Sequence, residues 1–249
     1  MASQGRVASR AVVKRHYAVL PPEGIPESVL PDWSATAARV LTAPAMGAGF
    51  VEVMLDLGAE GRTKQTLAAG IEAFFYVLEG QARLELRGQT HDLEPGGFAY
   101  LTPGSAFALA ARGGPAKLLG LRKRYEPLAG HAPADRIGNE RDVVGEPFME
   151  LDALRLKKLL PDTVDYDLAM NIFTFQPGSA LPVTETHVME HGLYFLAGGG
   201  DYYLGDSWYP VTAGDFIWMG PYCPQGFLAQ GPQPSRYIYY KNVNRDIAL

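Results

Sequence analysis

The sequence predicts an all-β protein made of two tandem jelly-roll barrels in one chain. Glycine (28) and proline (19) are frequent and separate short runs of aromatic and β-branched residues, as expected of short strands joined by turns. In addition, landmarks of the first half recur in the second half at one fixed distance. Duplicated antiparallel strands favour a double jelly roll over a parallel α/β sheet.

The strand candidates are short apolar runs. A first strand is expected at 16–20, and the clearest later ones lie at 74–78, 194–196, 216–219 and 237–240. Helical periodicity is scarce. One short helix is expected where Leu151, Leu154, Leu156, Leu159 and Leu160 precede Pro161, which would end it.

The repeat has a period of 118 residues. Gly80 and Gly198 each end a strand run, the segment 95–98 precedes 213–216 by the same distance, and Lys123 precedes Lys241 likewise. Between the copies, residues 126–148 combine several prolines and glycines with charges, as in a connector. We therefore expect an N-terminal barrel at 1–130, and a linker with the C-terminal barrel at 131–249.

Composition restricts the partner and the chemistry. The chain of 249 residues is 47% hydrophobic, which is enough for two cores, and its net charge of −5 favours a small-molecule partner over nucleic acid. Cys223 is the single cysteine, so an internal disulfide and a thiolate-rich zinc site are excluded. No segment has the length of a membrane span and no secretory signal is evident, so we expect a soluble, cytoplasmic protein without a membrane partner.

The first fifteen residues contain Arg6, Arg10, Lys14 and Arg15 and no acid. This pattern fits either an organelle transit peptide or a basic N-terminal arm. Because the segment is short and leads directly into the first expected strand, the arm is the favoured interpretation.

One cluster has the composition of a metal site. His16, His91 and His131 are scattered and are expected at the surface, whereas Glu185, His187 and His191 lie within seven residues. On an extended chain Glu185 and His187 point to one face, and a tight reversal can turn His191 towards it. Imidazole and carboxylate together suit Mn, Fe, Co, Ni or Zn.

Two other interpretations fit the same residues. The cluster could be a solvated loop. Residues 187–191 also match the H-x-x-E-H of inverted zinc peptidases, whose chemistry requires a helix. Pro182 and Gly192 bracket the stretch, and the β-branched residues before His187 disfavour that helix.

The spacing resembles the first cupin motif, G(x)5HxH(x)3,4E(x)6G, with the acid and one histidine exchanged. Glu185 and His187 occupy the two histidine positions, His191 occupies the acid position, and Gly198 closes the motif. Counting from Gly214, the histidine position of the second cupin motif holds Gln225. This set of four residues is similar to the second domain of the (S)-ureidoglycine aminohydrolase family of two-domain cupins. The resemblance runs from Val13 to the ending 239–246.

The resemblance implies a function. In it Glu185, His187, His191 and Gln225 bind one divalent ion per chain, with Mn²⁺ as the ion the family implies. Glu185, Tyr202, Tyr237 and Lys241 are the implied catalytic and substrate-binding residues. The implied reaction is hydrolytic release of ammonia from (S)-ureidoglycine, giving (S)-ureidoglycolate, in the breakdown of purine-derived ureides.

The repeat supplies an internal control. A displacement of 118 residues maps the four ligand candidates onto Leu67, Ala69, Ala73 and Phe107, none of which binds metal. The first barrel is therefore expected to be apolar inside, with a scaffolding role. A cupin dioxygenase or isomerase and a non-catalytic ligand-binding or storage cupin remain alternatives. Open sheet edges and the metal-free barrel favour a homo-oligomer.

Overall fold

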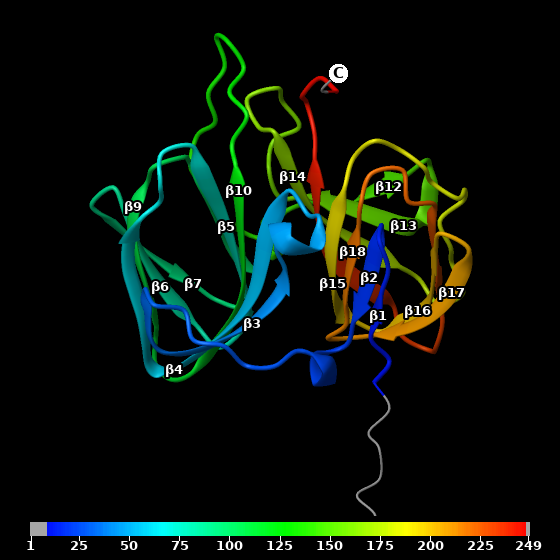
Figure 1. Cartoon of the computed structure of the whole chain (residues 1–249), viewed down its shortest axis with the longest axis horizontal. Coiled ribbons are helices and arrows are strands. Elements are labelled where there is room, and N and C mark those ends of the chain that lie inside the picture. Colours follow the sequence, from blue (N-terminus) through cyan, green and yellow to red (C-terminus); the bar gives the residue numbers. More distant parts are fainter. Residues whose placement is uncertain (1–8, 248–249) are drawn as a thin grey trace, which may run out of the picture.

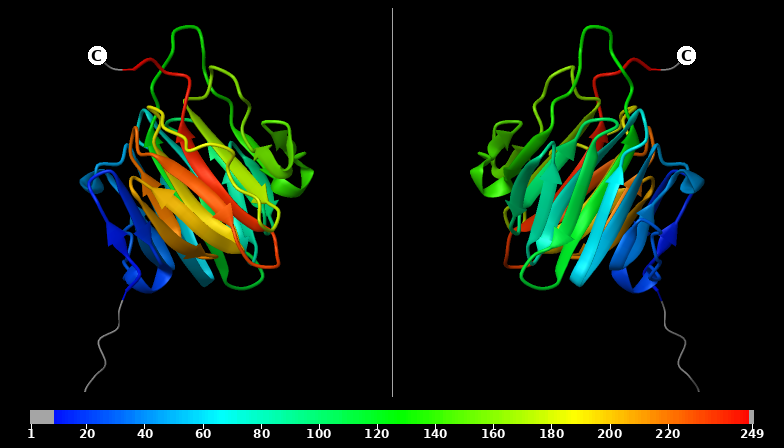
Figure 2. Two further views of the ribbon diagram at one scale, coloured as in Figure 1. Left: turned by 90° about the vertical axis from the view of Figure 1, so that its right-hand side faces the viewer. Right: turned by 90° about the vertical axis from the view of Figure 1, so that its left-hand side faces the viewer.

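The structure, a computed structural model that describes residues 9–247, consists of two β-barrels side by side (Figure 1). The segment that follows β10 projects beyond the barrels close to the C-terminal end of the chain (Figure 2). Within the described residues no helix is long and apolar enough to cross a membrane. The all-β two-barrel prediction is confirmed.

The first barrel is one curled nine-stranded sheet with the order β11-β8-β5-β10-β4-β9-β6-β7 and β3 paired to β4. Its strands are β3 (Trp33–Thr42), β4 (Phe50–Thr66), β5 (Ile71–Glu79), β6 (Ala82–Leu86), β7 (Gln89–Leu93), β8 (Gly97–Leu101), β9 (Ala106–Ala111), β10 (Ala116–Arg124) and β11 (Arg136–Asn139). The long strand β4 connects the two halves of this sheet, because its first half pairs with β10 and its last residues pair with β9.

The second barrel combines an eight-stranded and a three-stranded sheet. The larger follows the order β1-β2-β18-β15-β20-β14-β13-β12 and the smaller β17-β16-β19. The strands are β1 (Val12–Val13), β2 (Tyr17–Leu20), β12 (Glu146–Phe148), β13 (Leu151–Lys158), β14 (Leu168–Phe175), β15 (His191–Ala197), β16 (Gly199–Leu204), β17 (Ser207–Thr212), β18 (Phe216–Met219), β19 (Gln225–Ala229) and β20 (Ser235–Asn242). Three short 3-10 helices, η1 (Pro22–Gly24), η2 (Pro44–Met46) and η3 (Glu140–Asp142), lie in connections.

Each barrel receives a strand from the other side of residue 130. The N-terminal strand β2 pairs with β18 of the second barrel, although it precedes the whole first barrel in the chain. In return β11, which follows the expected boundary, pairs with β8 of the first barrel. Sheet membership therefore departs from the expected ranges 1–130 and 131–249 at these two segments.

The short helix expected at 151–160 is wrong, because residues 151–158 form strand β13. Leu154 pairs with Phe175 and Leu156 with Phe173 of the neighbouring strand β14. These two leucines are two residues apart and share one face, which is the period of a strand rather than a helix. Tertiary pairing along β14 thus decides the conformation of a segment whose local pattern is ambiguous.

The strand runs and the repeated glycines are confirmed. The runs at 74–78, 194–196, 216–219 and 237–240 lie in β5, β15, β18 and β20. Gly80 and Gly198 both have left-handed φ angles, 71° and 68°. A Cβ at Gly80 would lie 2.2 Å from the Pro115 carbonyl oxygen, and one at Gly198 would lie 2.7 Å from that of Pro234. Both glycines are therefore required by the same turn.

Strand pairing shows that the repeat contains gaps. Ala73 pairs with Arg122 in the first barrel, whereas His191, its counterpart 118 residues later, pairs with Lys241. The counterpart of Lys241 is therefore Arg122, and the sequence-based match with Lys123 is wrong by one residue. The last strand of the second copy is shifted by one extra residue.

A second shift affects the first ligand position. Phe107 pairs with Gln65, whereas Gln225 pairs with Glu185. The counterpart of Glu185 is therefore Gln65 and not Leu67. Two extra residues between Ala180 and Glu185, in a stretch that includes Pro182, produce the shift.

Three hydrophobic cores hold the molecule together. One fills the first barrel and contains Leu67, Ala73 and Phe107, while Ala69 is exposed. One fills the second barrel around the tyrosines of β20. The third lies between the barrels, where side chains of β4 and β5 pack against those of β15, β18 and β20.

The N-terminal arm is fixed to the second barrel by a bidentate ion pair. Both Arg10 terminal nitrogens lie 2.8 Å from the carboxylate oxygens of Asp215, whose side chain is fully buried. Asp215 also accepts a hydrogen bond from the backbone N–H of Thr212 in the turn before β18. From residue 9 onwards the basic segment is therefore part of the fold, and residues 1–8 lie outside the described residues.

We predict that Arg10→Ala lowers the free energy of unfolding by about 1 kcal/mol, because a buried carboxylate loses its cation. Chemical denaturation with a control variant, Arg15→Ala, measures this effect. Arg15 is exposed on the same arm, and its removal should leave stability unchanged. Equal stability of the two variants would contradict the anchoring role.

Candidate metal centre and active site

The four ligand candidates come from three segments of the second barrel. Glu185 and His187 lie in the connection between β14 and β15, His191 begins β15, and Gln225 begins β19. Glu185 and Gln225 are linked by two backbone hydrogen bonds of 2.9 and 3.0 Å, which hold the connection against the start of β19. The β15 pairing then turns His191 towards the barrel interior, where it lines the cavity.

The two imidazoles face each other. Their Nε2 atoms are 3.1 Å apart, while Nδ1 of His187 lies 3.2 Å from the Met189 carbonyl oxygen and Nδ1 of His191 lies 3.2 Å from that of Tyr240. A carbonyl accepts only, so each Nδ1 carries the proton and each Nε2 presents a lone pair. Two lone pairs directed at one point could hold a shared cation.

Both imidazoles are held neutral. Burial lowers the pKa of His191 to about 3, with further lowering by His187 and Lys241. The pKa of His187 is also lowered, first by burial and then by Lys241, against the raising influence of Glu185. Neutral imidazole is the form that coordinates metal, so no proton has to be displaced from either Nε2 at neutral pH.

The separations suit one shared divalent ion. Two nitrogens that are each about 2.1 Å from the same ion lie no more than about 4.2 Å apart, and the imidazole nitrogens are 3.1 Å apart. The Gln225 amide nitrogen is 3.2 Å from His187 Nε2, and its oxygen accepts from the Tyr202 hydroxyl at 3.1 Å. Reversing the amide presents the oxygen to the ion and the nitrogen to Tyr202, and the two orientations are isosteric.

Glu185 is the outermost of the four. Its nearer carboxylate oxygen is 3.9 Å from His187 Nε2, which is within the span of one shared ion. Among residues 9–247 no three His, Cys, Asp or Glu side chains are already arranged around one point. The four ligand candidates therefore surround one point only if the Gln225 amide is included and the Glu185 side chain rotates. That side chain is 28% exposed, which leaves it room to rotate.

The implied substrate residues lie in the same cavity. It has a volume of about 60 Å³ and is lined by Glu185, His191, Gln225, Tyr202, Tyr237 and Lys241 together with Phe148, Phe173, Leu181, Leu193 and Tyr239. A water needs about 10–15 Å³ of such space, so the cavity holds a few waters or one small polar molecule. The cavity therefore brings candidate metal ligands, one amine and three hydroxyls together between apolar side chains.

Burial sets the protonation of these groups. It raises the pKa of Tyr202 and of Tyr237 well above the usual value, so both hydroxyls stay protonated and donate hydrogen bonds. The pKa of Lys241 is lowered, because the effect of burial exceeds the raising influence of Glu185.

Tyr239 was not singled out from the sequence. Its alternation with Tyr237 and Lys241 on one face of β20 is the signal that identifies it.

Glu190 is a second residue that the sequence did not single out. Its carboxylate accepts hydrogen bonds from the backbone N–H of Gly49 in the first barrel, at 2.8 and 3.1 Å, and from Trp218 Nε1 at 3.3 Å. Its own N–H donates to Asn242 at 2.7 Å. Glu190 immediately precedes His191, so the first barrel holds the histidine segment in place. Residues 182–190 contain no helix, which disfavours the H-x-x-E-H peptidase interpretation.

Comparison with known proteins identifies the family. A cupin-domain family model matches residues 59–121 and 171–240. The chain is 35% identical to (S)-ureidoglycine aminohydrolase of Escherichia coli strain K12, over 98% of this chain and 95% of that protein. It is 38% identical to (S)-ureidoglycine aminohydrolase of Arabidopsis thaliana, over 96% of this chain and 79% of that protein. The chain belongs to the (S)-ureidoglycine aminohydrolase family.

Solved structures agree with this family assignment. The crystal structure of protein Ylba from E. coli superposes with a TM-score of 0.87 at 34% identity, covering all of both chains. An oxalate decarboxylase structure superposes with a TM-score of 0.71 at 12% identity, over 92% of this chain and 78% of that one, and shares the fold alone.

We predict that Glu190→Ala weakens Mn²⁺ binding about tenfold, because His191 loses the contact that fixes its segment. Isothermal titration with Mn²⁺ measures the change, and Glu60→Ala, which removes an exposed carboxylate of the first barrel, is the matched control. Unchanged Mn²⁺ affinity in the Glu190 variant would show that the segment is held without the first barrel.

Proposed function

We propose that this protein is a metal-dependent (S)-ureidoglycine aminohydrolase that releases ammonia and forms (S)-ureidoglycolate. The observation that supports the proposal is one cavity lined by His191, Gln225 and Lys241, with His187 Nε2 lying 3.1 Å from His191 Nε2 and 3.2 Å from the Gln225 amide nitrogen, in a chain of that family. In the reaction the bond from carbon to the amino group breaks, water supplies the new hydroxyl, and the departing nitrogen takes up a proton.

The ion-binding group of the proposal is Glu185, His187, His191 and Gln225, with one ion per chain and Mn²⁺ as the ion. This mixture of imidazole, carboxylate and amide donors without thiolate suits such an ion. When bound, the ion supplies Lewis-acid polarisation and an anchor for substrate heteroatoms. The first barrel has Gln65, Leu67, Ala73 and Phe107 near the corresponding positions, a set that cannot replace it.

The remaining groups orient the substrate. Lys241 pairs with the substrate carboxylate, since an ammonium in an apolar cavity gains much from an opposite charge. The protonated hydroxyls of Tyr202 and Tyr237 donate to the ureido oxygen. Because the cavity is closed by aromatic side chains on one side, water reaches one face of the reacting carbon, and a single enantiomer forms.

Glu185 is assigned two tasks in the proposal. It binds the ion, and its exposed carboxylate at the edge of the set is placed to pass a proton between water and the departing amine. The pair of tasks matches its position, since it is the only acid among the residues that line the cavity.

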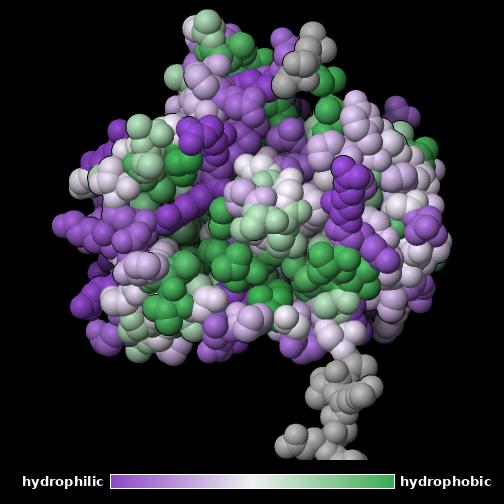
Figure 3. Space-filling model, viewed as in Figure 1, coloured by the Kyte–Doolittle hydropathy of each residue, from purple (hydrophilic) through white to green (hydrophobic). Residues whose placement is uncertain are grey.

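We also propose that the protein self-associates. On the face in Figure 3, hydrophobic side chains gather around the seam between the barrels, and Val13 of β1 and Val40 of β3 are 65% and 38% exposed. Light scattering after gel filtration measures the state in solution. A mass of 27 kDa at micromolar concentration would reject self-association.

For the reaction itself, we predict that purified protein supplied with freshly generated ureidoglycine releases ammonia and gives (S)-ureidoglycolate, and that a chelator abolishes both. The assay measures ammonia and product handedness, in air and without oxygen. Equal rates without oxygen distinguish this hydrolysis from a dioxygenase reaction. Racemic product, or a rate that a chelator does not change, would overturn the proposal.

We predict that Lys241→Met raises KM for ureidoglycine about 10- to 100-fold with a smaller effect on kcat, because a charged hydrogen bond to the carboxylate is lost in both the bound and the transition state. Lys158→Met, which removes an exposed lysine paired with Asp162, serves as the control. A loss confined to kcat would assign Lys241 to the chemical step.

A further inference from the structure

The first barrel contains a cavity of its own. It has a volume of about 110 Å³ and is lined by Leu30, Trp33, Val51, Val53, Leu55 and Phe75, with Gly120 and Arg122 completing the wall. All these residues except Arg122 are apolar or glycine. The space is larger than the one that holds the proposed active site, and its single charged lining group is a cation.

Arg122 takes the place that Lys241 takes in the second barrel. Ala73 pairs with Arg122 as His191 pairs with Lys241, and both basic residues lie on the last strand of their sheet repeat. The barrel that lost its ligand histidine therefore retains a basic group at the position that faces the substrate carboxylate in the proposed function. The gapless repeat hides this correspondence, because it matches Lys241 with Lys123.

Lys123 has a different environment from Arg122. It is buried in the core between the barrels, where its ammonium lies 2.5 Å from Asp167 and 3.8 Å from Glu72. These two carboxylates neutralise the Lys123 ammonium. Arg122, in contrast, has no carboxylate within ion-pairing distance among residues 9–247, and Asp32 is the acid that contributes most to its surrounding potential.

The guanidinium is held by a chain of neutral groups. Arg122 Nη2 donates to Gln65 Oε1 at 2.6 Å, Gln65 Nε2 donates to Thr63 Oγ1 at 2.6 Å, and the Thr63 hydroxyl donates to the Asp32 carbonyl oxygen at 2.6 Å. This chain fixes the direction of the side chain and uses one of its five N–H donors. The other donors remain for a ligand.

We propose that the first barrel is a second ligand site, in which Arg122 binds the carboxylate of a small monocarboxylic acid. Arginine suits this ligand because its planar fork matches both oxygens of a carboxylate. A half-buried guanidinium without a counter-ion is costly, and a bound anion relieves that cost. The apolar walls select a compact acid with one charge over a dianion, whose second charge would meet no cation.

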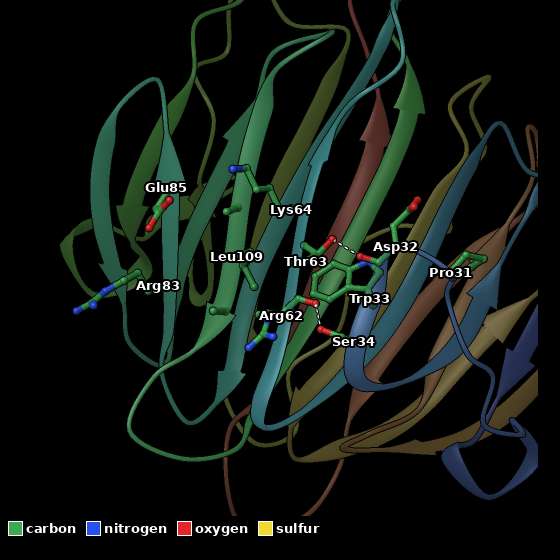
Figure 4. A pocket seen from close by; sticks show the side chains of 12 residues that line it. Pro31, Asp32, Trp33, Ser34, Arg62, Thr63, Lys64, Arg83, Glu85 and Leu109 are labelled. Carbon is green, nitrogen blue, oxygen red and sulfur yellow. Dashed lines mark hydrogen bonds between the residues drawn. The ribbon is translucent and has the colours of Figure 1, made fainter.

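Trp33 separates this cavity from the exterior and provides a reporter. Its side chain lines the inner cavity and also an outer groove of about 460 Å³, which Arg62, Lys64 and Arg83 border. Figure 4 shows that groove, with Trp33 beside Thr63. Binding next to the indole should change its fluorescence. Asp32 and Glu85 line the same groove, so the three basic side chains leave a net charge of +1 there and attract anions only weakly.

The test uses the full chain carrying Lys241→Met, so that the second barrel does not contribute carboxylate binding. Titration with glycolate is expected to give a saturable change in tryptophan fluorescence, and the neutral isostere glycolamide is expected to give none. Adding Arg122→Met should weaken glycolate binding at least tenfold. The substitution Val53→Phe, which fills the cavity and leaves the charge in place, should weaken it as well.

Three results would overturn the proposal. One is the absence of saturable glycolate binding to the Lys241→Met protein, whatever the state of the other variants. Another is equal glycolate affinity with and without Val53→Phe, which would place binding outside the cavity. The third is binding of inorganic phosphate in preference to glycolate, which would contradict the selection for a single charge. None of these results depends on ammonia release, so the proposed function is tested separately.

Discussion

Two neutral imidazoles present their Nε2 lone pairs to each other at 3.1 Å inside the second barrel. Backbone carbonyls fix both rings by taking the Nδ1 protons, and burial keeps both rings uncharged. Much of the second barrel contributes to this contact. The β15–β20 register places His191 on the interior face, and the backbone bridge between Glu185 and Gln225 closes the segment over it.

The first barrel helps to hold these two imidazoles in position. Its Gly49 N–H holds Glu190, the residue before His191, and the apolar core between the barrels keeps that bond in place. The exchange of β2 and β11 ties the barrels further, because each sheet is completed by a strand from the other part of the chain. The first barrel therefore supports the histidine segment, and the proposed carboxylate site would give its interior a ligand of its own.

The sequence predicted the fold, and it grouped ligand candidates that the structure brings close together, because glycine turns and ligand spacing are local signals. Gly80, Gly198 and Gly214 mark the same turns in both copies, and their left-handed φ angles explain why the period is visible. The sequence failed where pairing partners decide the outcome. Residues 151–158 become a strand through β14, and the true counterparts of Glu185 and Lys241 emerge only from strand registers that one- and two-residue insertions shift. Glu190 was missed because its partner, Gly49, lies in the other barrel.

The most direct test of the shared cation site is pulsed electron paramagnetic resonance of the protein loaded with Mn²⁺. The account predicts one ion per chain with couplings to two imidazole nitrogens, of which one disappears in His187→Ala and one in His191→Ala. Gln65→Leu, at the corresponding position of the first barrel, should leave the spectrum unchanged. Nitrogen couplings that survive both histidine substitutions, or an ion bound in the first barrel, would contradict it.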